Sequence, residues 1–159
     1  MNDEFPPGTG LAPAETLRSL SGFEFLTRLA RGELPPPPIS HTMNMRIESV
    51  ERGKVVFTST PGAFAYNPIR SIHGGYAATL LDSCMGCAVQ SMVEAGFGYT
   101  TLELKVSYVR GLTHDSGELR ATGRALHVGR RSGFAEGEIV DTRGRLIAHG
   151  TTTCLVFPQ

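Results

Sequence analysis

Residues 67–92, NPIRSIHGGYAATLLDSCMGCAVQSM, predict a turn followed by one long helix. Asn67-Pro68 opens the turn, and His73-Gly74-Gly75 stands directly before an unbroken helical pattern. The backbone N–H groups at the start of a helix lack acceptors within the helix and lie at the positive end of its dipole. We therefore expect this helix start to hold an anion, or an oxygen atom that becomes negatively charged.

The predicted helix carries one carboxylate, Asp82, before Glu94. Steps of four residues place positions 74, 78, 82, 86 and 90 on one face of the helix, and the residues there are Gly, Ala, Asp, Gly and Gln. This face has little side-chain bulk, so it can border a groove in which a substrate lies beside Asp82. The same small residues can instead allow close packing, with Asp82 at a solvated edge, and the pattern leaves both interpretations open.

The two ends of this stretch are too far apart to act on one atom. Gly74 and Asp82 lie roughly 12 Å apart along the helix, because each residue adds ~1.5 Å of rise. One reacting carbonyl therefore cannot contact both the Gly74 N–H and the Asp82 carboxylate of the same helix. Two copies related by a two-fold axis, with antiparallel helices, would bring one group from each copy together. The spacing thus predicts two active sites per dimer, both at the dimer interface.

Composition narrows the possible partners and location. The 159 residues suit one domain, and 15 Lys and Arg balance 15 Asp and Glu, for a formal net charge of zero. There is no overall basic charge to attract nucleic acid or an anionic membrane, and no apolar run approaches the ~18 residues of a transmembrane helix. The acidic residues of MNDEFPPGTG do not suit a signal peptide, and three cysteines argue against a disulfide framework. We expect a cytoplasmic protein with no nucleic-acid or membrane partner.

The rest of the chain predicts an α+β fold. Apolar residues recur at every third position from Leu17 to Leu29, which predicts an N-terminal helix from residue 14 to about residue 32. The prolines at 35–38 end this helix and form a stiff connector. Alternating patterns predict strands at 41–50, 54–59, 99–109, 117–128, 133–141 and 146–157. Short turns between the strands favour a mostly antiparallel sheet with the long helix across one face. We expect residues 1–38 to form a tail, a helix and the connector, and residues 39–159 to form the main domain.

Several motifs, in this order, carry a resemblance to a known family. They are Asn67, His73-Gly74-Gly75 and Asp82 at their mutual spacing, TLELKVSY at 101–108, GRR at 129–131 and AHGTTT at 148–153. The set resembles the hotdog-fold acyl-CoA thioesterases, in particular the PaaI-like and Arthrobacter-type 4-hydroxybenzoyl-CoA thioesterase group, over residues 45–157. The resemblance implies an antiparallel sheet wrapped around a long central helix, to which this chain adds an N-terminal helix. It also implies a homodimer with a continuous sheet, often doubled to a homotetramer.

The resemblance further implies a role for each matching residue. Gly74 would donate its backbone N–H to the thioester oxygen. Asp82 of the facing subunit would act as the nucleophile or as the general base on water. Asn67 would position the water or the thioester, and His73 would brace the loop at the helix start.

A hydroxyl and a set of substrate-binding residues complete the implied site. Thr100 falls where relatives carry a Ser or Thr near the attacking water, with the neighbouring Thr101 as the alternative. The residues implied to bind the substrate or its coenzyme A portion are Gly75, Arg110, Gly129, Arg130 and Arg131. No metal or other cofactor is expected, because a thioester is already activated and coenzyme A is part of the substrate.

Cys84 and Cys87 match a C-x-x-C pattern, which can indicate redox or metal chemistry. Reactive pairs of this kind lie at a helix N-terminus, where the dipole lowers the thiol pKa. Because this pair comes ten residues into the predicted helix, we interpret both residues as small buried hydrophobic side chains.

The expected reaction is hydrolysis of an acyl-CoA thioester to the free acid and coenzyme A. Phe64, Tyr66 and Tyr76 surround the helix start in the sequence and favour an aromatic acyl group of the phenylacetyl or hydroxybenzoyl type. A medium-chain acyl group is the other possible substrate. The alternatives are a hotdog module that binds acyl-CoA without cleaving it, and a hotdog hydratase or dehydratase.

Overall fold

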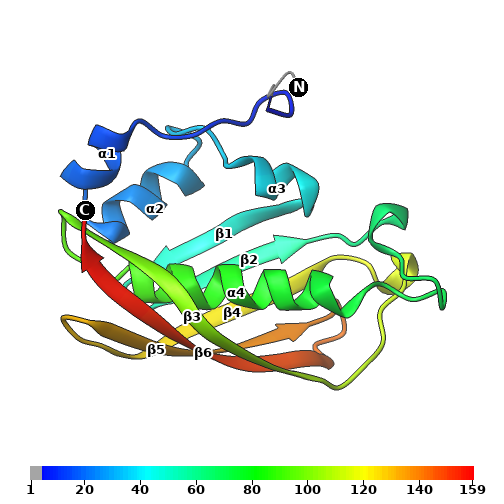
Figure 1. Ribbon diagram of the computed structural model, residues 1–159. Helices are drawn as coiled ribbons and strands as arrows, with labels where there is room; N and C mark the ends of the chain where they lie inside the picture. Colours follow the sequence, from blue (N-terminus) through cyan, green and yellow to red (C-terminus); the bar gives the residue numbers. More distant parts are fainter. Residues whose placement is uncertain (1–4) are drawn as a thin grey trace.

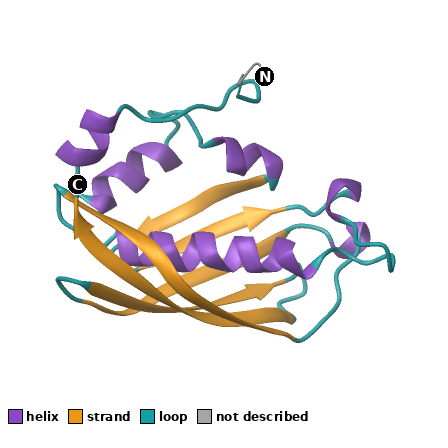
Figure 2. Cartoon of the chain, viewed as in Figure 1, coloured by secondary structure: helices purple, strands orange, loops and turns teal. Residues whose placement is uncertain are grey.

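The computed structural model describes residues 5–159 as one six-stranded antiparallel sheet curled around a long helix, α4 (Gly74–Gln90). Figure 1 shows α4 crossing the concave face of the sheet, with three shorter helices gathered beside the first strand. The same arrangement of helices and strands is coloured by type in Figure 2. The strand order is β1-β2-β4-β5-β6-β3, and every neighbouring pair is antiparallel. This architecture confirms the predicted α+β fold with a central helix.

The elements follow the sequence patterns closely from β2 onward. The strands are β1 (Met45–Glu51), β2 (Lys54–Ser59), β3 (Phe97–Tyr108), β4 (Leu119–Val128), β5 (Ser132–Val140) and β6 (Leu146–Pro158). The short helices before them are α1 (Ala14–Ser19), α2 (Gly22–Ala30) and α3 (Pro38–Thr42). Within residues 5–159, no helix is both long enough and apolar enough to cross a membrane.

The helix expected from residue 14 to about residue 32 is in fact two helices, α1 and α2, so this prediction was wrong in its continuity. The break falls at Ser21, which starts α2 with a capping box. The Ser21 hydroxyl accepts the N–H of Glu24 at 3.3 Å, and the Glu24 carboxylate accepts the N–H of Ser21 at 3.0 Å. These two bonds satisfy backbone N–H groups at the start of a new helix. In an uninterrupted helix the same N–H groups would donate to carbonyls of the preceding turn instead.

The strand predicted at 41–50 begins later, at Met45, because residues 38–42 form α3. Pro38 is the first residue of α3, a position where the missing N–H costs nothing and the fixed φ suits a helix. Asn44 has a φ of 45° and joins α3 to β1. The proline connector therefore ends in a short helix instead of leading straight into the sheet.

α4 starts and ends close to the predicted positions and supplies much of the core. His73 caps its start, because Nδ1 of His73 accepts the N–H of Gly75 at 2.8 Å. The buried residues of the helix are Tyr76, Ala77, Leu80, Leu81, Cys84, Met85, Gly86, Ala88 and Val89. Gly86 serves packing, because a Cβ there would lie 2.8 Å from the ring of Tyr99. Of the two interpretations of the small-residue face, close packing therefore holds at this position.

The sheet has two edges, β1 and β3. An edge strand presents a row of unpaired backbone N–H and C=O groups that can pair with another chain. β3 is a long edge of 12 residues, and its Leu102 side chain is 61% exposed. The N-terminal helices lie instead beside β1 (Figure 1), where Leu26 of α2 is only 1% exposed. The two edges thus differ, since β1 is flanked by helices of the same chain.

Replacing Gly123 with alanine should destabilise the protein, because β4 and α4 meet at this residue. An added Cβ would overlap the backbone carbonyl of Cys84 in α4. We expect Gly123→Ala to lower the free energy of unfolding by about 1–3 kcal/mol, as overpacking usually does. Urea denaturation followed by circular dichroism measures this change. Gly111→Ala is the matched control, because a Cβ there meets nothing within 4 Å. Equal stability of the two variants would contradict the proposed close contact.

Candidate active site

The start of α4 opens into a surface cleft of about 250 Å³, which we call the helix-start cleft. Its lining includes Asn67, His73, Gly74, Tyr108 and Arg110. Gly74 is the first residue of α4, so its N–H has no acceptor within the helix. The neighbouring Gly75 N–H is already bonded to His73, which leaves Gly74 as the donor suited to an oxygen atom in the cleft.

Tyr108, to which the sequence assigned no role, covers the helix start. Its hydroxyl donates to the Gly74 carbonyl oxygen at 3.1 Å, and its ring lies where a Gly74 Cβ would come within 3.2 Å. A glycine at this position therefore lets the β3 edge strand lie close to the helix start. The sequence shows a tyrosine at the last position of TLELKVSY. Its contact with Gly74 could not be predicted, because it depends on the pairing of β3 with β6 and on the curl of the sheet.

Asn67 builds the loop before the helix. Its Oδ1 accepts the N–H groups of Ile69 and Ser71, each at 3.1 Å, and its Nδ2 donates to the Ser71 hydroxyl at 2.9 Å. Arg70 takes a φ of 65° inside this loop. Among contacts within residues 5–159, one Nδ2 hydrogen of Asn67 is left for a ligand. Most of the Asn67 side chain thus shapes the loop that leads to His73.

Asp82 lies two turns further along α4 and is half-buried. The Thr101 hydroxyl donates to Asp82 Oδ1 at 2.8 Å. The register of β3 explains why Thr101 holds this position: Thr101 pairs with the buried Cys154, while Thr100 pairs with Leu155. Neighbouring strand residues point to opposite faces, so Thr101 faces α4 and the exposed Thr100 faces away. The hydroxyl beside Asp82 in this chain therefore belongs to Thr101, the alternative to the expected Thr100.

A cavity of about 330 Å³ lies beside Asp82, and we call it the Asp82 cavity. Ser83 and Cys87 of α4 and Tyr99 of β3 border it on the helix side. Its other lining residues are Leu29, Ala30, Pro36, Pro37, Ile39, Ser40, Met45, Arg46, Ile47 and Phe57. Most of these are apolar and come from the N-terminal segment and from β1. The sequence could not place the N-terminal segment here, because periodicity says nothing about which distant elements meet.

The aromatic residues expected near the substrate have other positions. Tyr76 is buried, and its hydroxyl contacts Ser59 and donates to the Met43 carbonyl at 3.0 Å. The Tyr66 hydroxyl bonds Nδ1 of His114 at 2.6 Å, which ties two loops together. Phe64 is largely exposed. The aromatic residues that line the Asp82 cavity are Phe57 and Tyr99 instead.

The arginines expected to meet coenzyme A are split between the two ends of α4. Arg110 lines the helix-start cleft. Gly129 and Arg130, in the turn between β4 and β5, line another hollow of about 280 Å³ together with Met92, just beyond the end of the helix. Arg131 follows in the same turn, where its carbonyl accepts the N–H of Val156 at 3.1 Å. One copy of the chain therefore does not gather these arginines into one binding site.

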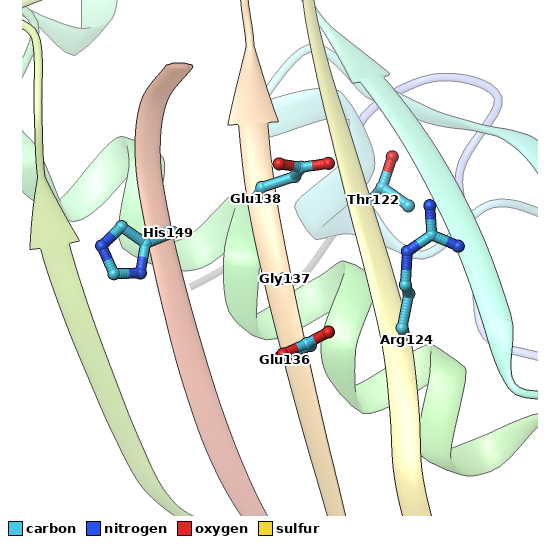
Figure 3. Close-up of a pocket in the computed structure, with 6 residues that line it drawn as sticks. All are labelled: Thr122, Arg124, Glu136, Gly137, Glu138 and His149. Atoms are coloured by element: carbon cyan, nitrogen blue, oxygen red, sulfur yellow. The ribbon is translucent and has the colours of Figure 1, made fainter.

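A polar hollow of about 240 Å³ lies on the other face of the sheet. It is lined by Thr122, Arg124, Glu136, Gly137, Glu138 and His149. Figure 3 shows these side chains in front of the strands, with α4 behind the sheet. The sheet thus separates the hollow from Gly74 and Asp82, so we do not include it in the candidate site.

The helix-start cleft and the Asp82 cavity are separate. Within residues 5–159, the residues that line the one do not line the other. The observed helix runs unbroken from Gly74 past Asp82, which keeps these two residues roughly 12 Å apart along its axis. Each copy of the chain therefore carries two candidate half-sites, one with a backbone donor and one with a carboxylate.

The cysteines of α4 should be chemically inert in the folded protein. Burial raises the pKa of the Cys87 thiol to about 12 and raises that of Cys84 further. A raised pKa keeps a thiol protonated at pH 8, and the thiolate is the reactive form. We expect the three cysteines to react slowly with a chromogenic disulfide reagent in the native state, and all three to react at once in guanidinium chloride. Rapid labelling of one thiol in the native protein would contradict this interpretation.

Comparison with known proteins agrees with the fold and with a thioester hydrolase. The sequence profile of the Thioesterase superfamily matches residues 70–148, which include Gly74, Asp82 and Thr101. The 1,4-dihydroxy-2-naphthoyl-CoA hydrolase of Listeria monocytogenes is 24% identical over 118 residues, covering 74% of this chain and 94% of the hydrolase. This match favours hydrolysis over binding without cleavage and over hydration.

Two solved structures extend the comparison. A putative thioesterase from Ralstonia eutropha, described as phenylacetic acid degradation-related, is 28% identical with a TM-score of 0.75, over 82% of this chain and 98% of that protein. The Escherichia coli PaaI protein has the same fold, with a TM-score of 0.73 at 24% identity, over 87% of this chain and 96% of PaaI. The chain therefore belongs to the thioesterase superfamily and is a thioester hydrolase with the PaaI-like hotdog fold.

Proposed function

We propose that the protein hydrolyses acyl-CoA thioesters to the free acid and coenzyme A at sites formed between two copies of the chain. The observation that carries this proposal is the pair of separate half-sites on α4, with Gly74 in one and Asp82 in the other. In a dimer with antiparallel α4 helices, Gly74 of one copy would face Asp82 of the other. Each dimer would then hold two complete sites.

The β3 edge supports this form of assembly. Two copies of β3 can pair about a two-fold axis and join two six-stranded sheets into one. The exposed Leu102 and Tyr108 side chains on this strand would lose contact with water in such a pair. Tyr108 also touches Gly74, so a partner strand at this edge would lie close to the helix-start cleft.

The two half-sites would divide the chemistry between them. The Gly74 N–H would donate to the thioester oxygen and stabilise the negative charge that develops there, and one such donor contributes ~3 kcal/mol. Asp82 of the facing copy would take a proton from water, a contribution of ~10²–10⁴-fold, or attack the carbonyl carbon itself. When Asp82 acts as the base, the activated water adds to the carbonyl carbon and the C–S bond breaks to give the free acid. When Asp82 is the nucleophile, the C–S bond breaks to leave an acyl-aspartyl anhydride, which water then hydrolyses to the free acid and Asp82. In both cases the coenzyme A thiolate leaves and takes up a proton.

Thr101 and His73 would position these two groups. The Thr101 hydroxyl occupies Asp82 Oδ1, which leaves Oδ2 to meet the water or the substrate. His73 accepts the Gly75 N–H, and this fixes the first turn of α4 and the direction of the Gly74 N–H. Asn67 would act mainly by holding the loop between Tyr66 and His73, with one Nδ2 hydrogen available to a ligand.

The antiparallel dimer would also bring the separated arginines to one site. Arg110 lies in the cleft with Gly74 of its own copy. Arg130 of the partner subunit would lie past the end of the partner helix, ~15 Å further out than Asp82 along that helix. The extended pantetheine arm could span that distance from the thioester to the coenzyme A phosphates. Arg130 and Arg131 would thus bind phosphate in the dimer although they are remote from Asp82 in one copy.

The acyl group is proposed to be aromatic, of the phenylacetyl or hydroxybenzoyl type, or of medium chain length. The similarity to a naphthoyl-CoA hydrolase and to a phenylacetic acid degradation-related protein supports an aromatic acid. The mainly apolar lining of the Asp82 cavity suits either kind. We propose a cytoplasmic homodimer, which could pair further into a tetramer.

Mixing two inactive variants should restore activity if each site draws on two copies. We expect Asp82→Asn and Gly74→Pro each to lower kcat at least ~100-fold in thiol release from an acyl-CoA, because they remove the carboxylate and the donor N–H. Proline is tolerated at the first position of a helix. Co-refolded in equal amounts, the variants should recover about a quarter of the wild-type activity, since half of the dimers would carry one intact site.

Gly74→Ala is the control for the Gly74→Pro variant. It adds a Cβ beside the movable Tyr108 side chain but keeps the N–H, so it should retain most of the activity. If the mixture stays as inactive as its two components, although native mass spectrometry detects mixed dimers, the shared site would be disproved. Full activity of Asp82→Asn alone would remove Asp82 from the mechanism.

Thr101→Val should impair hydrolysis more than Thr100→Val. The first change removes the hydrogen bond to Asp82 Oδ1, and we expect a loss in kcat of roughly tenfold. The second change alters an exposed side chain on the other face of β3, and we expect activity close to wild type. Steady-state thiol release by the two variants decides between them, and the opposite ranking would return the role to Thr100.

A further inference from the structure

The Asp82 cavity is covered by the N-terminal segment of the chain. β1 and β2 contribute Met45, Ile47 and Phe57 to its lining. Residues 29–40, which we call the roof, contribute Leu29, Ala30, Pro36, Pro37, Ile39 and Ser40. The roof runs from the end of α2 through the four prolines into α3 (Figure 1).

The roof is anchored at both ends to the rest of the fold. On the α2 side, the Gly22 N–H donates to the Val93 carbonyl at 2.9 Å, and Leu26 is fully buried. A Cβ on Gly22 would overlap the Gln90 carbonyl, so α2 begins in direct contact with the end of α4. These contacts fix the position of Leu29 and Ala30, because they lie on the same short helix.

The other end of the roof is attached to β2 and to α4. The Met43 carbonyl accepts the hydroxyls of Ser59 at 2.9 Å and of Tyr76 at 3.0 Å. The Asn44 side chain donates to the Thr60 carbonyl at 3.0 Å. Between the two anchors, the prolines at 35–38 restrict the backbone. The roof is therefore held at a fixed distance above β1 and cannot easily collapse into the cavity.

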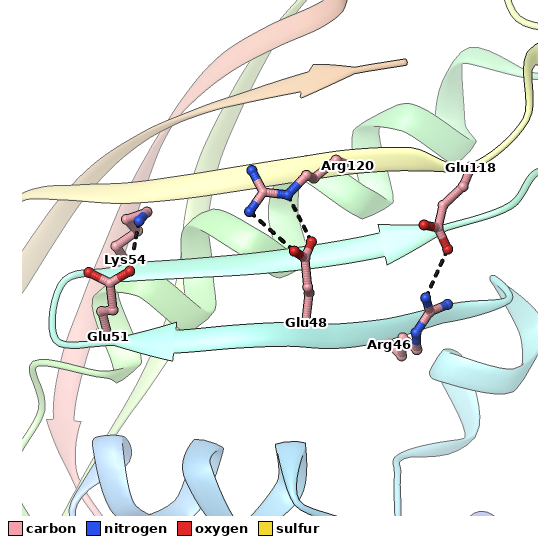
Figure 4. A network of polar contacts seen from close by, with 6 residues as sticks. All are labelled: Arg46, Glu48, Glu51, Lys54, Glu118 and Arg120. Carbon is pink, nitrogen blue, oxygen red and sulfur yellow. Dashed lines mark hydrogen bonds and ion pairs between the residues drawn. The ribbon is translucent and has the colours of Figure 1, made fainter. Parts of the chain in front are cut away.

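The lining is mainly apolar, and two of its residues are charged. Asp82 is one, and Arg46 is the other. Arg46 already pairs with Glu118 at 2.9 Å, beside the Arg120–Glu48 pair that links β4 to β1 (Figure 4). An acyl group with its own negative charge would thus find no cation in this lining that lacks a partner among residues 5–159. An uncharged acyl group suits the cavity.

The volume of the cavity limits the size of that group. A water molecule occupies ~30 Å³ in the liquid, and a methylene group is of similar size. The cavity of about 330 Å³ therefore has room for about eleven such groups. A phenylacetyl or a decanoyl group lies within this volume, whereas the sixteen carbons of a palmitoyl group exceed it.

We propose that the roof sets the upper limit on acyl size, so that the enzyme accepts uncharged acyl groups of up to about ten or eleven carbons. Leu29 and Ala30 determine this limit by their bulk where α2 meets the cavity. The inference rests on the proposed function, because the acyl group must enter the cavity next to Asp82. It extends that function to the N-terminal segment, which lies outside residues 70–148, the region matched by the superfamily profile.

The test compares ligands of increasing chain length in two independent measurements. Calorimetry gives the Kd of S-alkyl-coenzyme A thioethers with 4 to 16 carbons, which bind but cannot be hydrolysed. Thiol release gives kcat/KM for the matching acyl-CoA esters. We expect both to be best at or below about ten carbons and at least roughly tenfold worse at sixteen. Leu29→Ala should shift both optima to longer chains, and Ala30→Phe should shift them to shorter ones.

Matched substitutions far from the cavity serve as controls. Leu11→Ala and Ala14→Phe make the same chemical changes at exposed positions and should leave both profiles unchanged. Thermal melting of all four variants shows whether they fold. Tightest binding of the sixteen-carbon ligand by the wild type, or unshifted profiles in both folded roof variants, would overturn the proposal. If the binding profile shifts while no acyl-CoA releases thiol, the roof inference stands and the proposed hydrolysis of acyl-CoA fails.

Discussion

The fixed rise of α4 is the constraint on which the site depends. A rigid helix cannot bring its first N–H and a carboxylate eight residues later to the same carbonyl. The surrounding structure makes this helix hard to bend, because Gly123 lets β4 approach its backbone and Gly22 lets α2 approach its end. A catalytic site that uses both groups must then be completed by a second copy. In the proposed function, this constraint makes self-association part of the chemistry.

The sequence predicted the parts of the fold that depend on local patterns. The long helix and β2 to β6 lie close to where apolar periodicity and turn residues placed them. The N-terminal helix was less well predicted, since its apolar spacing continues through Ser21 although the chain breaks there. The missed signal was the Ser21–Glu24 capping box, which marks a helix start within an apparently continuous stripe. Local hydrogen bonding outweighed periodicity at this point.

The candidate site shows the same division between local and distant information. The positions of Gly74 and His73 at the start of α4, and of Asp82 within it, could be predicted from their order and spacing. The choice between Thr100 and Thr101 could not, because one step along a strand reverses the face of the side chain, and β3 shifts register between Thr101 and Glu103. The Asp82 cavity was also beyond the sequence, since it forms only where the N-terminal segment meets β1 and α4. Tertiary contacts between distant segments decide both features.

The roof and the residues proposed for hydrolysis lie on different parts of the fold. The helix α4 packs on the concave face of the sheet, and β3 forms one edge of the sheet. Changes at Gly74, Asp82 or Thr101 would therefore disturb both the core and the proposed pairing of copies. The roof contacts this core mainly at its two anchors, near Gly22 and Met43. Its proline backbone loses little conformational entropy on folding, so it can hold an apolar cavity open without a large core of its own. Side chains on the roof can therefore change the volume beside Asp82 while Gly74, Asp82 and Thr101 keep their geometry.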